Sequence, residues 1–93
     1  MPAWFYILRL LSGKLYVGST RNFERRIRNH FARRGSRTTR FDPPRELAYW
    51  EEFSGYREAF RRERQVKGWT KAKKEALIRG DITALKQLAR RKH

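Results

Sequence analysis

Residues 4–18 read WFYILRLLSGKLYVG, two runs of aromatic and branched side chains separated by a short polar break. The runs over 4–10 and 14–18 have the composition of β-strands, and Ser12-Gly13 between them is a turn signal. The stretch therefore predicts a β-hairpin.

Side chains alternate between the two faces of a strand, so the hairpin divides its residues into two sets. In the first strand Tyr6 shares a face with Leu8 and Leu10, and in the second Tyr16 shares a face with Gly18. The two tyrosines lie on adjacent strands and are expected to line one side of the sheet.

The remainder of the chain predicts one more strand and four helices. The turn, capping and periodicity signals give the following order: a helix from an Asn22 cap to about residue 33, a loop over 33–40, a strand over 46–53, a helix over 56–67, a helix from a Thr70 cap to just before Gly80, and a helix that begins at an Asp81 cap and frays into Arg90-Arg91-Lys92. The predicted fold class is α+β, a small three-stranded antiparallel sheet flanked by helices.

Apolar patterns predict which sides of these elements face the core. Phe23, Ile27 and Phe31 recur at i, i+4 and i+8, a core stripe for the first helix. In the last strand Leu47 and Tyr49 are expected on the same face, because they are two residues apart.

Length and charge limit the classes of function. The 93 residues, of which 39% are hydrophobic, suit one domain over 1–93, with a core over 4–78 and a basic helix and tail over 81–93. The net charge is +15, from 24 Lys and Arg against nine acids. This surplus costs self-repulsion in the folded state, so we expect a polyanionic partner. Nucleic acid is favoured over a membrane surface, because no long helix shows one wide apolar face.

Other classes are excluded by what the sequence lacks. There is no cysteine, so disulfides and thiolate metal sites are ruled out. The longest apolar stretch, over 3–8, is too short to span a bilayer, and Arg9 interrupts the N-terminus before it resembles a signal peptide. We expect a cytoplasmic protein with no small-molecule cofactor.

Glu63 is the most informative candidate for chemistry. On its helix the apolar stripe includes Ala59 and Val66, so a carboxylate occupies a position where periodicity favours an apolar side chain. Burying that charge is costly unless a cation or a metal accompanies it. The alternative is an edge residue that pairs with Arg62 or Arg64.

Four more side chains are candidates for the same site. Arg26 and His30 share one face of the first helix, and Tyr6 and Tyr16 share one face of the sheet. An ordinary basic surface, a packed histidine and core tyrosines are the alternatives. The sequence has no Gly-rich phosphate loop and no clustered zinc-site histidines, so those chemistries are not supported.

In this order the residues resemble the GIY-YIG nuclease superfamily. Tyr6 corresponds to the tyrosine of the first motif, and Tyr16-Val17-Gly18 to the second. The resemblance covers 4–78 and is closest to the small single-domain bacterial branch, which is related to the N-terminal nuclease module of the DNA-repair excinuclease. In the first motif Trp4-Phe5 replaces the glycine and isoleucine by bulkier groups.

The resemblance implies a metal-dependent endonuclease that hydrolyses DNA phosphodiester bonds. It implies catalytic roles for Tyr6, Tyr16, Arg26 and His30, with Glu63 holding one Mg²⁺ or Mn²⁺ ion. Water is the implied nucleophile, and which tyrosine relays its proton stays open. Little sequence specificity is expected, with structure-selective cutting as an open alternative.

Basic residues outside this set are expected to grip the DNA backbone without reading bases, and RNA is an open alternative partner. They are Arg33, Arg34, Arg37, Arg40, Lys67, Lys71, Lys73 and Lys74. The competing hypothesis is a non-catalytic basic nucleic-acid-binding module. A pure binder has no need for Glu63 inside an apolar stripe, and this separates the two.

Overall fold

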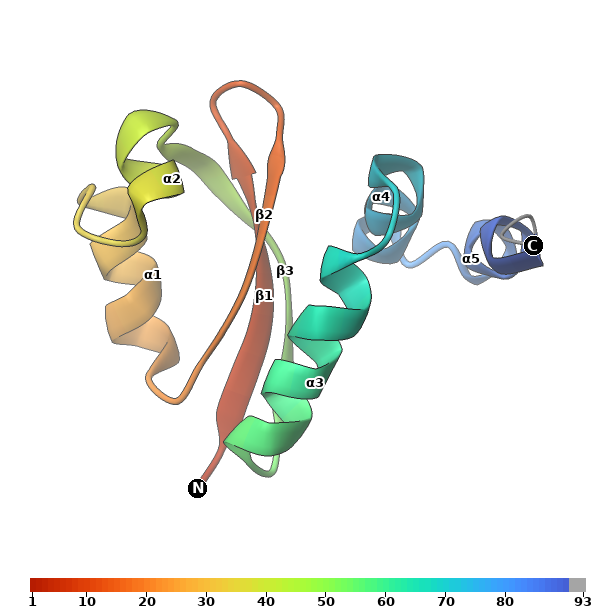
Figure 1. Ribbon diagram of the computed structural model, residues 1–93, viewed down its shortest axis with the longest axis horizontal. Coiled ribbons are helices and arrows are strands. Elements are labelled where there is room, and N and C mark those ends of the chain that lie inside the picture. The colour runs from red at the N-terminus through yellow and green to blue at the C-terminus, as the bar shows by residue number, and fades with distance from the viewer. Residues whose placement is uncertain (91–93) are drawn as a thin grey trace.

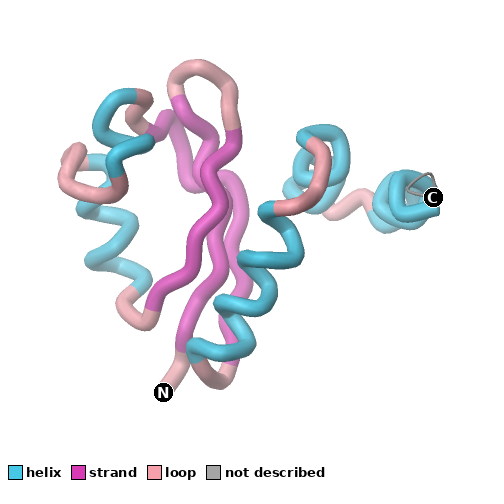
Figure 2. The backbone as a smooth tube through the Cα atoms, in the orientation of Figure 1, coloured by secondary structure: helices cyan, strands magenta, loops and turns pink. Residues whose placement is uncertain are grey.

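Three antiparallel strands form the centre of the computed structural model, which describes residues 1–90 (Figure 1, Figure 2). The strands are β1 (Ala3–Leu10), β2 (Leu15–Thr20) and β3 (Pro44–Phe53), in the spatial order β2-β1-β3. Within the described residues the helices are α1 (Phe23–Phe31), α2 (Arg37–Phe41), α3 (Tyr56–Lys67), α4 (Lys71–Arg79) and α5 (Ile82–Arg90). The predicted α+β class is confirmed, with α1 and α3 on opposite sides of the sheet (Figure 1).

The predicted hairpin is present, and β1 and β2 pair in register along their length. At its tip the Leu10 amide donates to the Lys14 carbonyl at 2.9 Å, and the Gly13 amide donates to the Leu10 carbonyl at 2.9 Å. Gly13 has a φ of +93°, a conformation that glycine adopts without steric cost. The turn chemistry therefore fixes the register that places Tyr6 and Tyr16.

Each face of the sheet has its own hydrophobic cluster. On the α3 side, Phe5, Ile7 and Val17 pack with Val66 of α3 and Leu77 of α4. Burial of these side chains supplies the main stabilisation of that layer.

On the α1 side the buried residues are Tyr6, Leu8 and Leu10, and Phe23 and Ile27 pack against them. The predicted alternation of β1 is thus confirmed. It puts the Tyr6 phenol under α1, while its neighbours in the chain face α3.

The predicted core stripe of α1 is wrong at its last position. Phe31 is 44% exposed, whereas His30 is 0% exposed. Phe23, Ile27 and His30 follow i, i+4, i+7 spacing, which stays on one face of a helix better than i+8 does. The helix also ends at Phe31, slightly earlier than predicted.

Strand β3 departs from simple alternation. Ile7 pairs with Tyr49 and Leu8 with Leu47, so the register shifts between these two pairs. Leu47 therefore packs on the α1 side and Tyr49 on the α3 side. The prediction that they share a face is wrong, because one inserted residue reverses the side chains that follow. The strand also begins at Pro44, earlier than predicted, on a sheet edge that tolerates proline.

The predicted loop over 33–40 contains the short helix α2, so that prediction is wrong in its second half. Ser36 caps α2 by accepting a hydrogen bond from the Thr39 amide at 3.3 Å. Thr39 is completely buried and contacts His30 of α1. Local composition alone predicts an irregular loop here, whereas the tertiary contact with His30 holds the segment as a short helix.

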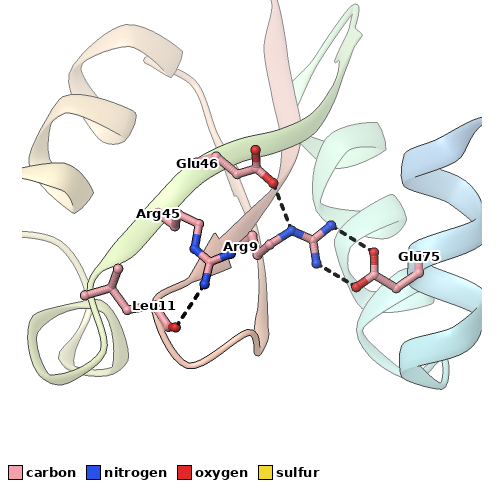
Figure 3. Close-up of polar contacts among 5 residues, drawn as sticks. All are labelled: Arg9, Leu11, Arg45, Glu46 and Glu75. Carbon is pink, nitrogen blue, oxygen red and sulfur yellow. Dashed lines mark hydrogen bonds and ion pairs between the residues drawn. The ribbon is translucent and has the colours of Figure 1, made fainter.

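One ion pair links the hairpin to α4 (Figure 3). The Arg9 guanidinium in β1 donates two hydrogen bonds to Glu75, at 2.7 and 2.9 Å, and one to Glu46 of β3 at 2.8 Å. This bidentate geometry is the strong form of an Arg–carboxylate pair. It joins α4 to two strands of the sheet.

The last helices follow the predicted boundaries. Gly80 ends α4 with a φ of +70°, and Asp81 caps α5 by accepting from the Ala84 amide at 3.0 Å. The predicted fraying at Arg91 and Lys92 lies outside the described residues. No helix within residues 1–90 has the length and hydrophobicity needed to cross a bilayer.

Candidate active site

Tyr6 and Gly18 are paired across β1 and β2. A Cβ atom added at position 18 would overlap the Tyr6 hydroxyl and the ring carbon that bears it. Gly18 therefore leaves room for the Tyr6 ring to extend across β2, the edge strand of the sheet. This close approach packs the buried phenol against the β2 backbone, under α1.

A buried hydrogen-bond chain begins at that phenol. The Tyr6 Oη lies 2.8 Å from the His30 Nε2, and the His30 Nδ1 lies 2.8 Å from the Thr39 Oγ1. The Thr39 hydroxyl donates to the Ser36 carbonyl at 3.2 Å, so its oxygen is left to accept from Nδ1–H. The Nε2 atom then has no proton and accepts from Tyr6 O–H.

Burial and charge set the protonation of this pair. Burial lowers the pKa of His30 to about 4, and the nearby Arg26 contributes to the lowering. Burial raises the pKa of Tyr6 to about 12, against a lowering by Arg26; Tyr16 and Glu63 also raise it. At neutral pH His30 is therefore uncharged and Tyr6 keeps its proton, as the hydrogen-bond chain requires.

Arg26 and Tyr16 complete the α1 side of the site. The Tyr16 ring lies 6.5 Å from the Tyr6 ring and 5.1 Å from the His30 ring, measured between centroids. Burial opposes the charge of the half-buried Arg26, but the adjacent Tyr6 and Tyr16 outweigh it and raise the pKa of the guanidinium. Two phenols and one permanent cation therefore lie side by side.

Glu63 of α3 contacts β2 from the other face of the sheet. Its Oε1 accepts a 2.6 Å hydrogen bond from the Ser19 hydroxyl, and its side chain is 15% exposed. Ser19 follows Gly18 and points to the opposite face, toward α3. The carboxylate is nevertheless near enough to Tyr6 to raise the pKa of the phenol. Glu63 and the two phenols therefore flank β2 from opposite faces of the sheet.

The alternative partners of Glu63 are engaged elsewhere. Arg62 donates to Glu51 at 2.9 Å, and Arg64 lies over the Phe60 ring, 5.9 Å from its centroid. Among the ion pairs of residues 1–90, the cation that pairs with Glu63 is Lys67, 3.7 Å from Oε2 and 67% exposed. The lysine is exposed and the separation is long, so another cation can replace Lys67 at the carboxylate.

An open hollow of about 490 Å³ lies next to these groups. We call it the arginine hollow, and it is lined by Ser19, Thr20, Arg21, Asn22, Arg25, Arg26 and Tyr56. Asn22 caps α1 by accepting from the Arg25 amide at 3.2 Å, so the positive end of the helix dipole adds to the arginine charges. This combination suits a phosphate group.

The residues present fit a single divalent ion. Within residues 1–90 no group of three or more His, Cys, Asp or Glu side chains gathers as a metal cage. Mg²⁺ commonly binds through one or two carboxylates, with water and substrate phosphate as its other ligands. Glu63, held by Ser19, which also lines the basic hollow, offers that type of site.

The basic residues predicted to grip DNA lie outside the arginine hollow, and one of them, Lys67, pairs with Glu63. Figure 1 shows α2 and α4 on either side of the hairpin tip, whereas β2 leads into α1 at the other end of the sheet, where α3 begins. The four predicted arginines lie on or just before α2, and Lys67 lies at the end of α3 and the other three lysines on α4. They do not line the arginine hollow. Their role stays a prediction.

Six residues around the site were not predicted from the sequence: Ser19, Thr20, Arg21, Arg25, Thr39 and Tyr56. Ser19 and Thr39 carry no motif, because isolated hydroxyl residues are common in strands and turns. Arg21 and Arg25 are hidden by the high arginine content of the whole chain. Their positions on either side of the Asn22 cap are a signal that marks a basic helix start.

This chain is similar to known proteins over most of its length. Residues 2–76 match the family described as the GIY-YIG catalytic domain. A UPF0213 protein of Bacillus pumilus is 39% identical over 75 residues, covering 81% of this chain and 76% of the relative. A UPF0213 protein of Klebsiella pneumoniae is 37% identical over 90 residues, covering 96% of this chain and 85% of the relative.

A solved structure shares the fold. The solution NMR structure of the UPF0213 protein BH0048 from Bacillus halodurans superposes with a TM-score of 0.57 at 34% identity, covering 87% of this chain and 86% of that one. The chain therefore belongs to the GIY-YIG nuclease superfamily and, within it, to the small UPF0213 family. GIY-YIG nucleases act on nucleic acid and generally use divalent metal ions.

Proposed function

We propose that this protein is a divalent-metal-dependent endonuclease that hydrolyses DNA phosphodiester bonds with little sequence specificity. One observation supports it above the others. Arg26 lies beside both phenols and lines the arginine hollow, and Ser19, which holds Glu63, lines the same hollow. A phosphate in the hollow would contact Arg26, with the two phenols adjacent to that guanidinium and the Glu63 carboxylate one hydrogen bond away through Ser19.

Arg26 is assigned to the transition state. Attack on a phosphodiester builds negative charge on the pentacovalent phosphate, and a cation already in place stabilises it without reorganisation. The pKa of Arg26 lies above its ordinary value, so the guanidinium stays charged at every working pH. Its half-buried position keeps water from screening that charge.

The two tyrosines take different roles in this proposal. A phenol accepts a proton from water most readily as its phenolate, which an adjacent guanidinium stabilises. Tyr16 is partly exposed and lies next to Arg26, so we assign it to the attacking water. Tyr6 is buried, has a pKa of about 12 and donates to His30, so it positions the site and does not titrate there.

Glu63 would hold the divalent ion. A bound ion would offset the charge of the scissile phosphate and of the leaving oxygen. Ser19 restricts the orientation of the carboxylate, and the exposed Lys67 would be displaced from it by a bound ion. The chain thus supplies one fixed ligand.

Nicking of supercoiled plasmid in Mg²⁺ or Mn²⁺ tests the proposal. We expect the wild type to nick, and Glu63→Gln to bind DNA normally but not nick, because the amide keeps the Ser19 contact and loses the charge. Glu58→Gln is the matched control, since it makes the same change on the exposed side of the same helix.

Two results would count against it. Equal nicking by Glu63→Gln and wild type would remove Glu63 from the reaction. A wild type that binds DNA but nicks no substrate with either metal would instead indicate a nucleic-acid-binding module.

A further inference from the structure

Three aromatic side chains form a row on the α1 side of the sheet. The Trp4 and Phe23 rings are stacked, with centroids 5.7 Å apart and planes 22° apart. The centroid of the Trp50 ring lies 6.0 Å from that of the Phe23 ring. We call Trp4, Phe23 and Trp50 the aromatic patch.

Much of this patch is open to solvent. Trp50 is 55% exposed, and Trp4 and Phe23 are partly exposed. Trp69 is different, because Arg62 and Lys73 lie over its ring, 5.4 and 4.2 Å from the centroid, and it packs against the core. The aromatic patch therefore offers ring surface that the core does not use.

The aromatic patch adjoins the candidate active site. Trp4 and Phe23 line an open hollow of about 320 Å³ together with Arg21, Asn22 and Glu24. Arg21 and Asn22 also line the arginine hollow, so the two hollows share a wall.

Phe23 also connects the patch to the buried phenol. Its ring centroid lies 6.4 Å from that of Tyr6. Because the two hollows share a wall, a DNA strand with one phosphate in the arginine hollow would bring a neighbouring base to the aromatic patch.

We propose that the aromatic patch stacks an unpaired nucleobase next to the scissile phosphate, so that the preferred substrate is DNA with an unpaired nucleotide, such as a flap or a frayed end. This inference rests on the proposed function, in which the phosphate held in the arginine hollow is the one that is cut. Stacking requires a base outside the duplex, because paired bases present only their edges in the grooves. The volume of the hollow lined by Trp4 and Phe23 is within the range of small-ligand pockets, about 300–1,000 Å³.

The charges around the patch suit a nucleotide better than an apolar partner. Arg21 lies between the two hollows and is able to hold a phosphate or to stack, as it already does on Tyr56 at 4.9 Å. Glu24 lines the hollow beside Trp4 and Phe23 and pairs with Arg28 at 3.0 Å, so its negative charge is compensated.

The test is equilibrium binding in EDTA, where no cutting occurs. Fluorescence anisotropy compares a labelled duplex that ends in one unpaired nucleotide with the same duplex carrying an abasic residue there. We expect the base to tighten binding roughly 5- to 150-fold, the range of base–aromatic stacking. Trp50→Ala should remove most of that ratio, and Trp50→Phe should restore part of it.

Phe41→Ala is the matched control, because Phe41 is 81% exposed on α2 and outside the patch. It should leave the ratio unchanged. Equal affinity for the base and abasic duplexes would overturn the proposal. So would a Trp50→Ala variant that keeps the wild-type ratio, or one that changes only self-association in sedimentation.

The two proposals fail separately. A wild type that nicks plasmid but shows no preference for the unpaired base would overturn this inference alone. Conversely, the protein could prefer the unpaired base in a Trp50-dependent way and yet never nick DNA. That result would support the stacking site and contradict the endonuclease function.

Discussion

The Ser19 hydroxyl donates a 2.6 Å hydrogen bond to the Glu63 carboxylate and thereby joins α3 to the edge strand β2. Hydrogen bonds to charged groups are about twice as strong as neutral ones. The bond fixes which way the carboxylate points. Because of this bond, Glu63 is a preoriented candidate metal ligand, unlike an acidic side chain that moves freely in solvent.

Ser19→Ala should lower the affinity of the site for the metal ion that nicking requires, and should leave the fold intact. Residues that orient a metal ligand typically contribute about 10- to 100-fold to metal affinity or activity. We expect the Mn²⁺ concentration for half-maximal nicking to rise by that order. Ser54→Ala, an exposed serine before α3, is the control. An unchanged metal titration in Ser19→Ala would show that the hydrogen bond does not prepare Glu63.

Gly18→Ala should destabilise the protein. The new methyl group would overlap the Tyr6 hydroxyl and ring, and overpacking of this kind costs about 1–3 kcal/mol of unfolding free energy. Urea unfolding measures it. In Gly68→Ala the added methyl has its nearest neighbour at 3.8 Å, so that variant should be as stable as the wild type or more so. Equal stabilities for the two variants would contradict the close approach of Tyr6 to β2.

Stability should fall as the pH is lowered from about 7 toward 4. The folded state holds His30 with a pKa of about 4, below the ordinary value of 6.5, so the unfolded chain binds more protons in that window. Stability is thus complete above pH 6.5 and is lost as the pH drops to the folded pKa, by up to about 3 kcal/mol. Urea unfolding between pH 4.5 and 7 measures it.

His30→Gln supplies the check on this pH dependence. The variant should be less stable at pH 7, because the buried chain from Tyr6 to Thr39 is broken. It should also lose most of the slope between pH 7 and 4.5, since the group that titrates there is gone. A slope as steep as that of the wild type would assign it to other residues.

The features that the sequence predicted correctly depend on local signals. The Ser12-Gly13 turn sets the hairpin, and the Asn22, Thr70 and Asp81 side chains cap the helices that follow them. Capping and turn geometry involve neighbours in the chain, so they can be recognised without knowing the fold.

The features that it missed depend on distant residues. Helix α2 is held by Thr39 against His30, and the displaced Leu47 reflects a bulge opposite β1. Ser19 matters only because Glu63 lies across from it. Such contacts link positions far apart in the chain, and no local pattern encodes them.

Arg26→Ala should slow nicking far more than it weakens binding. Loss of one preorganised donor to a transition-state charge costs about 10²–10³ in rate. Arg25→Ala is the neighbouring control, because Arg25 lines the same hollow but is exposed. Single-turnover nicking at saturating DNA separates rate from affinity. Similar rates for the two variants would place Arg26 among the ordinary phosphate contacts.

The salt dependence of binding should identify which arginines touch DNA. Each phosphate contact contributes about 0.9 to the slope of log K against log salt on duplex DNA. Arg25→Gln should reduce that slope by about this amount and weaken binding to all sequences alike, because Arg25 lines the arginine hollow. Arg34→Gln removes an equal charge from the segment just before α2, the helix that lies beside the hairpin tip in Figure 1. If the slope falls in Arg34→Gln and not in Arg25→Gln, DNA crosses the hairpin-tip end, and the hollow beside Glu63 is not where the backbone binds.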